Sequence, residues 1–257
     1  MVDSLLHDGL HCAIMNYHMG VTAENVAQDY HISREAQDAL AFESHRKSLA
    51  AQEEGLFDAE IVPVEIVKKG KSTFVSKDEG PKPETTPEIL AKLKPVFRED
   101  GTVTAGNASS MNDGAAAVVL VSEKKLKELS LTPLAEIKSI VSYGVEPRVM
   151  GIGPMFAIPK VLKDAGLKKE DVGVFEVNEA FAAQCVAVIR DLDLPKELVN
   201  PVGSGISLGH PVGCTGIRLI VTMLHHMKRN QIRYGLASLC VGGGPAMATV
   251  LEYCTNT

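Results

Sequence analysis

The chain has 257 residues, of which 45% are hydrophobic and 5% aromatic, and it contains no tryptophan. This length and composition are sufficient for a substantial buried core, in one large domain or in one domain with a smaller lobe. The formal net charge of -6 gives no electrostatic reason to expect nucleic acid as a partner. Because apolar runs such as 115–121 are too short to cross a bilayer, we expect no membrane partner either.

The five cysteines are odd in number and have no regular spacing, which argues against a disulfide framework. They are Cys12, Cys185, Cys214, Cys240 and Cys254. We expect free thiols in a reducing compartment, the cytoplasm. A mitochondrial location stays open, because any presequence would lie upstream of Met1.

The first part of the chain is predicted to be rich in loops. A long helix begins at the capping residue Ser33 and ends near Gly55. A strand at 61–67 follows. Residues 68–87 are rich in lysine, glycine and proline and indicate an extended excursion, with a short helix around 87–93.

From Gly114 onward, strand patterns alternate with helix patterns. The predicted strands cover 115–121, 135–143, 172–177, 235–240 and 246–253. The predicted helices cover 123–129, 153–166, 179–192 and 213–228. This order predicts an α/β fold, in which a mixed sheet carries helices on both faces and ligands bind where strands end and helices begin.

The most distinctive pattern is a histidine and a cysteine, each within a glycine-rich run, about 30 residues apart. The first run, 207–216, reads SLGHPVGCTG and contains His210. The second, 239–244, reads LCVGGG and contains Cys240. Glycine leaves space for a substrate to approach, and imidazole and thiol groups both transfer protons. A further run, 178–182, reads NEAFA.

These runs resemble motifs of the thiolase family, whose members join or split acyl groups on coenzyme A by Claisen chemistry. Residues 17–25, YHMGVTAEN, resemble the family's substrate-side motif. Residues 101–109, GTVTAGNAS, resemble its coenzyme A loop, and residues 112–115, NDGA, lead into the last strand of its first half. Because these motifs occur in the family's order, the whole chain is identified as similar to a thiolase.

The resemblance implies a thiolase-like layered fold with a loop-rich lobe. Residues 1–112 would form this lobe and the remainder of the N-terminal domain, residues 113–129 the last strand and helix of that domain, and residues 130–257 the C-terminal domain. In relatives, the nucleophilic cysteine precedes this region, and none of the five cysteines here matches it. We therefore expect most of the N-terminal half-domain to be missing, which would leave a sheet edge and an apolar face uncovered.

The resemblance also implies four catalytic positions. Cys240 matches the cysteine that takes a proton from the acetyl carbon next to the thioester. His210 matches the histidine that activates the nucleophile and donates a hydrogen bond to the thioester oxygen. Asn178 matches the asparagine that holds a water in the same oxyanion hole, and the Gly242 amide matches a donor of the second. Without the resemblance, the histidine would be an ordinary loop residue, the cysteine a core residue and the asparagine a helix cap.

The substrate-binding positions follow from the same resemblance. Those that match the coenzyme A loop are Ala105, Ala108 and Ser109. Those that match the thioester and acyl side are His18, Met19, Met150, Ala180 and Phe181. A bulky Met19 would shorten the acyl pocket and so favour acetyl and acetoacetyl groups.

Two other patterns are set aside. His7, His11 and His18 lie near helical spacing, but no carboxylate motif accompanies them, so we expect no metal site. The glycine-rich run 203–216 lacks the lysine followed by serine or threonine that ends a phosphate loop.

The predicted function is thiolase-type acyl transfer in lipid and fatty acid metabolism: condensation of two acetyl-CoA to acetoacetyl-CoA and CoA, or the reverse thiolysis. Coenzyme A thioesters would be the substrates, and no cofactor is expected. Because covalent catalysis needs the missing thiol, we expect the isolated chain to be incomplete and inactive in the full cycle.

Two alternatives remain open. The chain is then either the large subunit of a split thiolase or a non-catalytic acyl-CoA-binding or scaffold protein. The expected assemblies are a homo-oligomer or a complex with a complementing N-terminal thiolase chain.

Overall fold

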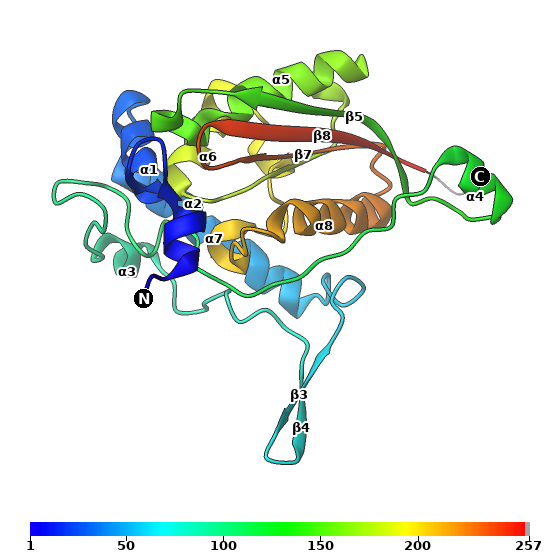
Figure 1. Ribbon diagram of the computed structural model, residues 1–257, viewed down its shortest axis with the longest axis horizontal. Helices are drawn as coiled ribbons and strands as arrows, with labels where there is room; N and C mark the ends of the chain where they lie inside the picture. The colour runs from blue at the N-terminus through cyan, green and yellow to red at the C-terminus, as the bar shows by residue number, and fades with distance from the viewer. Residues whose placement is uncertain (255–257) are drawn as a thin grey trace.

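The computed structural model describes residues 1–254, and its main element is a mixed four-stranded sheet (Figure 1). The strands are β5 (Ala135–Gly144), β6 (Val174–Val177), β7 (Tyr234–Cys240) and β8 (Pro245–Tyr253), in the order β5-β8-β7-β6. Strand β8 is antiparallel to both of its neighbours, whereas β6 and β7 are parallel, with Val177 opposite Ser238. The carboxyl ends of β6 and β7 therefore lie at the same end of the sheet.

Helices cover both faces of this sheet. Helices α5 (Pro154–Ala165) and α6 (Ala182–Asp191) pack on one face, and α8 (Thr215–Asn230) packs on the other (Figure 1). Successive side chains of a strand point to opposite faces, so Leu236 joins the α5–α6 core while Ala237 joins the α8 core. The predicted α/β fold is thus confirmed, and every strand and helix predicted after residue 130 is present with slightly shifted bounds.

The lobe contains two helices that lead to the sheet. Helix α2 (Arg34–Glu53) begins where predicted, because the Ser33 hydroxyl accepts a hydrogen bond from Ala36 N at 3.2 Å. It ends before Gly55, whose φ of 68° belongs to the left-handed region that favours glycine. Helix α1 (Met19–Asp29) is not indicated by the sequence pattern, since its N-cap is His18 rather than a typical capping residue.

A β-hairpin projects from the lobe (Figure 1). Its strands are β3 (Val64–Lys68) and β4 (Lys71–Val75), and all of their residues are exposed. The predicted strand at 61–67 is confirmed in its second half, whereas the predicted excursion at 68–87 contains an unforeseen strand. The turn residues Lys69 and Gly70 both have positive φ, as a type I′ hairpin turn requires. The short helix α3 (Pro87–Ala91) follows as predicted.

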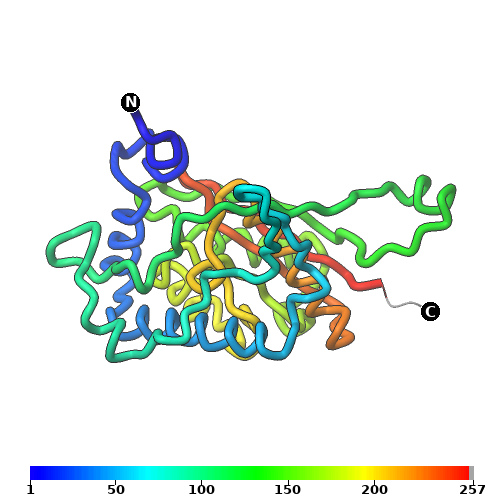
Figure 2. Tube along the Cα trace, turned by 90° about the horizontal axis from the view of Figure 1, so that it is seen from below, coloured from blue at the N-terminus to red at the C-terminus, as the bar shows by residue number. Residues whose placement is uncertain are grey.

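The strand predicted at 115–121 is wrong. This segment forms no ladder hydrogen bonds in the described residues, and the side chains of Val119 and Leu120 are 89% and 75% exposed. A strand needs a neighbour to pair with, and none of the strands in residues 1–254 lies alongside it. The next helix, α4 (Glu123–Glu128), is formed as predicted, and Figure 2 shows the chain around it extending beyond the sheet.

The remaining elements are short. They are η1 (Leu5–Leu10), β1 (His11–Cys12), β2 (Tyr17–His18), η2 (Pro147–Ile152), η3 (Lys169–Asp171), η4 (Lys196–Leu198) and α7 (Gly205–Leu208). In the part of the chain that the structure describes, no helix combines the length and the apolar character needed to span a membrane.

A half-buried carboxyl group, Glu60, joins the lobe to α8, and a fully buried one, Glu176, lies on β6 beneath the same helix. Thr222 on α8 donates a hydrogen bond to Glu60 at 3.0 Å, and Arg218 Nη1 lies 3.8 Å from Glu176 Oε2 on β6. Burial raises the pKa of Glu60 to about 7 and that of Glu176 to about 8, because desolvation outweighs the attraction of the Arg218 guanidinium. Part of the cost of docking the lobe therefore depends on pH.

Glu60→Gln is predicted to make the free energy of unfolding less dependent on pH. A carboxyl group whose pKa is raised by folding binds its proton more tightly in the folded state. Its contribution to stability is therefore complete below the unfolded pKa of 4.5 and is lost as the pH rises toward about 7. Glutamine retains an oxygen for Thr222 but cannot ionise, so the variant should be more stable than wild type at pH 8, by on the order of 2 kcal/mol.

Denaturant unfolding between pH 4.5 and pH 8 measures this difference, with the exposed substitution Glu99→Gln as the control. The two curves should converge at the acidic end. An unchanged pH slope in Glu60→Gln would contradict the prediction.

Candidate active site

The predicted site residues gather at the end of the parallel strand pair. Asn178 directly follows β6, and its backbone N donates to Ser238 O on β7 at 3.0 Å. Cys240 is the last residue of β7. His210 lies in the loop between α7 and α8 and reaches the same end, because its Nε2 is 3.4 Å from Asn178 Nδ2. The sheet therefore brings together residues from three separate sequence motifs.

His210 is held through its imidazole ring and through its backbone. Its Nδ1 lies 2.6 Å from Thr215 Oγ1, and its backbone N donates to Asn112 Oδ1 at 3.3 Å. Burial, helped by the charge of Arg218, lowers the pKa of His210 to about 4. The imidazole is therefore neutral at neutral pH and has a free lone pair with which to accept a proton.

Asn178 is 1% exposed and provides a second polar group beside His210. Its Oδ1 is buried and has no hydrogen-bond partner among the described residues. A buried amide oxygen without a partner loses the free energy of a hydrogen bond, so a ligand or water that donates to it would be favoured. The role of Asn178 in holding a water stays a prediction.

Cys240 lies in an apolar cluster, which we call the acyl cluster. Its buried members are Cys12, Met19, Ala23, Val103, Met150, Ala180, Phe181 and Cys240, and Ala108 packs against it. Burial raises the pKa of the Cys240 thiol to about 12. The thiol is therefore protonated at neutral pH, and proton abstraction by Cys240 needs a further group that favours the thiolate. In residues 1–254, no hydrogen bond joins the Cys240 thiol to the His210 imidazole.

Met19 and Gly242 are in direct contact. A Cβ atom built on Gly242 would lie 2.5 Å from Met19 Cε, so the thioether methyl of Met19 covers this glycine. His18 caps α1 by accepting from Gly20 N at 3.0 Å, and its ring stacks on Phe97 with centroids 4.8 Å apart. These contacts place both residues of the predicted substrate-side motif next to the acyl cluster.

The predicted coenzyme A loop is hydrogen-bonded to residues of the acyl cluster. Ser109 N and Ser109 Oγ both donate to Ala180 O, at 3.0 and 2.9 Å, and Ala108 forms an antiparallel bridge with Phe181. Ala105 is exposed in the turn that precedes them. The loop therefore runs from the surface to the acyl cluster.

The sequence analysis assigns no role to three contacting residues, Phe97, Asn112 and Thr215, although the last two lie in the runs 112–115 and 207–216. Phe97 packs edge-on to Phe181, with ring centroids 6.1 Å apart. Asn112 precedes the predicted strand at 115–121, and its contact with His210 spans 98 residues of sequence. Thr215 does carry a signal, because it lies five residues after His210, at the N-terminus of α8.

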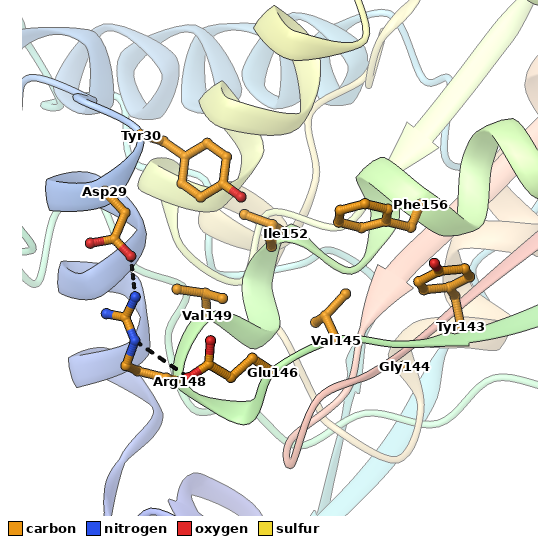
Figure 3. A pocket seen from close by; sticks show the side chains of 10 residues that line it. All are labelled: Asp29, Tyr30, Tyr143, Gly144, Val145, Glu146, Arg148, Val149, Ile152 and Phe156. Carbon is orange, nitrogen blue, oxygen red and sulfur yellow. Dashed lines mark hydrogen bonds and ion pairs between the residues drawn. The ribbon is translucent and has the colours of Figure 1, made fainter.

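A separate cavity of about 520 Å³ is lined in part by η2 (Figure 3). The stacked rings of Tyr143 and Phe156 form one end of it, and Arg148 forms ion pairs with Asp29 and Glu146 at the other. These charges already have partners, and none of the predicted catalytic residues lines the cavity. Within residues 1–254, no group of three or more histidine, cysteine, aspartate or glutamate side chains is arranged to hold a metal ion.

Comparison with known families agrees with this geometry. The thiolase N-terminal domain matches residues 1–124, and the thiolase C-terminal domain matches residues 131–253. The chain belongs to the thiolase family.

Individual relatives cover nearly the whole chain. A probable acetyl-CoA acyltransferase of Staphylococcus aureus (strain COL) is 51% identical over 253 residues, which are 98% of this chain and 64% of that protein. The crystal structure of the Bacillus anthracis acetyl-CoA acetyltransferase superposes with a TM-score of 0.95 at 50% identity, covering 98% of this chain and 64% of that one. Human mitochondrial 3-ketoacyl-CoA thiolase gives a TM-score of 0.92 at 42% identity with the same coverage. The chain thus spans 64% of the length of these relatives.

Gly205→Ala is predicted to displace Asn178 and to lower the free energy of unfolding by roughly 2 kcal/mol. The added Cβ would lie 2.8 Å from both Asn178 Oδ1 and the backbone Glu179 O, and the backbone cannot move aside cheaply. In Gly216→Ala, by contrast, the nearest atom would be Leu239 Cδ1 at 3.9 Å, so alanine should stabilise α8 by roughly 0.5–1 kcal/mol.

Denaturant unfolding of the two variants measures both effects. Equal stabilities would show that the close packing at Gly205 is not important.

Proposed function

We propose that this chain provides the acid–base half of a thiolase-type acyltransferase. The reaction is the condensation of two acetyl-CoA to acetoacetyl-CoA and CoA, or the reverse thiolysis. The observation that carries this proposal is the pairing of a neutral His210 with Asn178 at the strand end that also bears Cys240. The printed names of the relatives, acetyl-CoA acyltransferase and acetyl-CoA acetyltransferase, support an acetyl-CoA substrate.

The proposed chemistry follows from the character of each group. Cys240, as thiolate, takes a proton from the methyl carbon of the acetyl thioester, and the electron pair moves to the thioester oxygen. His210 accepts a proton from the nucleophilic thiol and then donates it in a hydrogen bond to that oxygen, together with a water on Asn178. The backbone N–H of Gly242 donates a hydrogen bond in the second oxyanion hole. Preorganised donors of this kind are worth on the order of 3 kcal/mol each.

The proposed cycle is that of the assembled enzyme. The enolate carbon attacks the thioester carbonyl of an acyl group held on a nucleophilic thiol, and that thiol leaves as the new carbon–carbon bond forms. None of the cysteines here matches this nucleophile by resemblance. Coenzyme A thioesters are then the substrates, no cofactor is needed, and the free thiols suit a cytoplasmic location.

Deuterium exchange into acetyl-CoA tests the acid–base half without the nucleophile. The wild-type chain in D₂O should incorporate deuterium into the acetyl methyl group faster than buffer does, and Cys240→Ala should reduce that excess by about 100-fold. Cys254→Ser, at a cysteine outside the acyl cluster, is the control and should exchange like wild type. Mass spectrometry of the recovered acetyl-CoA measures the rates.

Exchange by Cys240→Ala at the wild-type rate would overturn the catalytic assignment. Binding of acetyl-CoA without any excess exchange would favour the alternative, a non-catalytic acyl-CoA-binding protein.

The acyl cluster supports a short acyl group. Met19 covers Gly242 and belongs to the same apolar cluster as Met150 and Phe181, and we propose that these side chains limit the acyl length that fits beyond the thioester. We therefore expect wild type to bind acetoacetyl-CoA more tightly than a long-chain 3-ketoacyl-CoA. Met19→Ala should reduce the ratio of the two dissociation constants by roughly tenfold, since space for even one more methylene group in an apolar pocket is worth about 1–3 kcal/mol.

Isothermal titration with the two ligands checks this prediction, and Met15→Ala is the control at a partly buried methionine beside the cluster. A preference of wild type for the long chain would contradict it.

A specific observation favours the second candidate, the large subunit of a two-chain thiolase. Within residues 1–254, the apolar segment 115–121 pairs with no strand and is largely exposed, and an added strand would cover it. The occupant would be a separate N-terminal thiolase chain, and a homo-oligomer is the competing assembly. Co-purification with a shorter thiolase-like chain would support the two-chain assembly, whereas a single species of symmetric oligomer would support the other.

A further inference from the structure

The side chain of Thr215 makes two short contacts that together restrict its one hydroxyl proton. Thr215 is fully buried at the first position of α8. Its Oγ1 lies 2.6 Å from His210 Nδ1 and 2.9 Å from Pro211 O. A hydroxyl has one proton to donate, and it accepts with its lone pairs. The two contacts therefore cannot both be donated by Thr215.

The contact with Pro211 O determines where the hydroxyl proton of Thr215 points. Pro211 O is an acceptor only, so a 2.9 Å approach to Thr215 Oγ1 is attractive only when the hydroxyl donates to it. The same carbonyl accepts from the backbone N of Cys214 and of Thr215, which keeps it in this position. With its proton committed, Thr215 Oγ1 can only accept from His210, so the imidazole proton lies on Nδ1.

The other side of the ring fits the same assignment. His210 Nε2 faces Asn178 Nδ2 at 3.4 Å, and an amide nitrogen is a donor. A ring with its proton on Nδ1 offers a lone pair at Nε2, which accepts this contact. The unpartnered Asn178 Oδ1 is then left for a donor from outside the described residues.

The opposite tautomer requires two simultaneous changes. The Thr215 hydroxyl would have to donate to His210 Nδ1, which leaves its oxygen facing Pro211 O at 2.9 Å without a proton between them. The Asn178 amide would also have to be reversed, so that its oxygen accepts from Nε2–H. With the proton on Nδ1, the two oxygens of Thr215 and Pro211 have a proton between them, and the Asn178 amide keeps its orientation.

We propose that Thr215 is a positioning residue that holds the neutral His210 ring in its Nδ1–H tautomer and so presents the Nε2 lone pair toward Asn178 and the substrate site. The tautomer itself follows from the contacts above. Its use in catalysis rests on the proposed function, because a base at Nε2 is what proton transfer from a nucleophilic thiol requires. The low pKa of His210 keeps the ring uncharged, so that a tautomer is defined at neutral pH.

Nitrogen-15 NMR of the chain with labelled histidine tests the assignment directly. Long-range proton–nitrogen correlations distinguish a protonated ring nitrogen from one that carries a lone pair, and His210→Gln identifies the His210 signals by their loss. In wild type at pH 7, the proton should be on Nδ1. A wild-type spectrum with the proton on Nε2 would overturn the proposal, whatever the variants do.

Two matched variants test the part played by Thr215. Thr215→Ser keeps the hydroxyl and should retain the Nδ1–H pattern. Thr215→Val keeps the shape but has no acceptor for Nδ1–H, so the proton should move to Nε2 in half or more of the molecules. An unchanged Nδ1–H tautomer in a folded Thr215→Val would show that another group fixes the ring.

The spectra of the other histidines report whether each variant is folded, and the wild-type spectrum remains decisive if valine is not tolerated. Failure of deuterium exchange with acetyl-CoA would count against the proposed function but would leave the tautomer intact. Failure of the tautomer assignment and failure of the proposed function can therefore be distinguished.

Discussion

The parallel pairing of β6 and β7 is the constraint on which the site depends. Parallel strands end at the same edge, so the residue after β6 and the last residue of β7 lie at one edge of the sheet without any special loop. Asn178 and Cys240 occupy these two positions, and the backbone bond from Asn178 to Ser238 fixes their register. His210 then needs only one loop to reach the same edge. A change in this register by one residue would turn the site residues to the opposite face.

Burial determines the protonation of the groups at this edge. Desolvation penalises the charged form of any group, so it raises the pKa of the Cys240 thiol and lowers that of the His210 imidazole. Both groups are therefore neutral in the described structure, although one is an acid and the other a base. With charges removed, the positions of the protons depend on individual hydrogen bonds, which explains why a single hydroxyl such as that of Thr215 can matter.

Features that depend on local sequence could be predicted, and those that depend on distant neighbours could not. Helix α2 was predictable because Ser33 and Gly55 carry the signals for its two ends within the segment itself. Segment 115–121 has the composition of a strand, but a strand exists only beside a partner. The site motifs were recognisable from glycine, histidine and cysteine spacing, whereas the contact between Asn112 and His210 depends on how two segments meet.

The lobe holds the site through buried carboxylates rather than through apolar packing alone. Glu24 on α1 accepts from the backbone N of Thr102 and of Val103, at 2.9–3.0 Å, and so fixes the start of the predicted coenzyme A loop. Glu179, next to Asn178, accepts from Ser44 on α2 at 2.6 Å and from Ile206 N at 3.3 Å. Such bonds are directional, and a buried carboxylate without them would be costly. The lobe is therefore part of the machinery that keeps the loops of the site in position, and separating it from the sheet would leave these carboxyl groups without their hydrogen-bond partners.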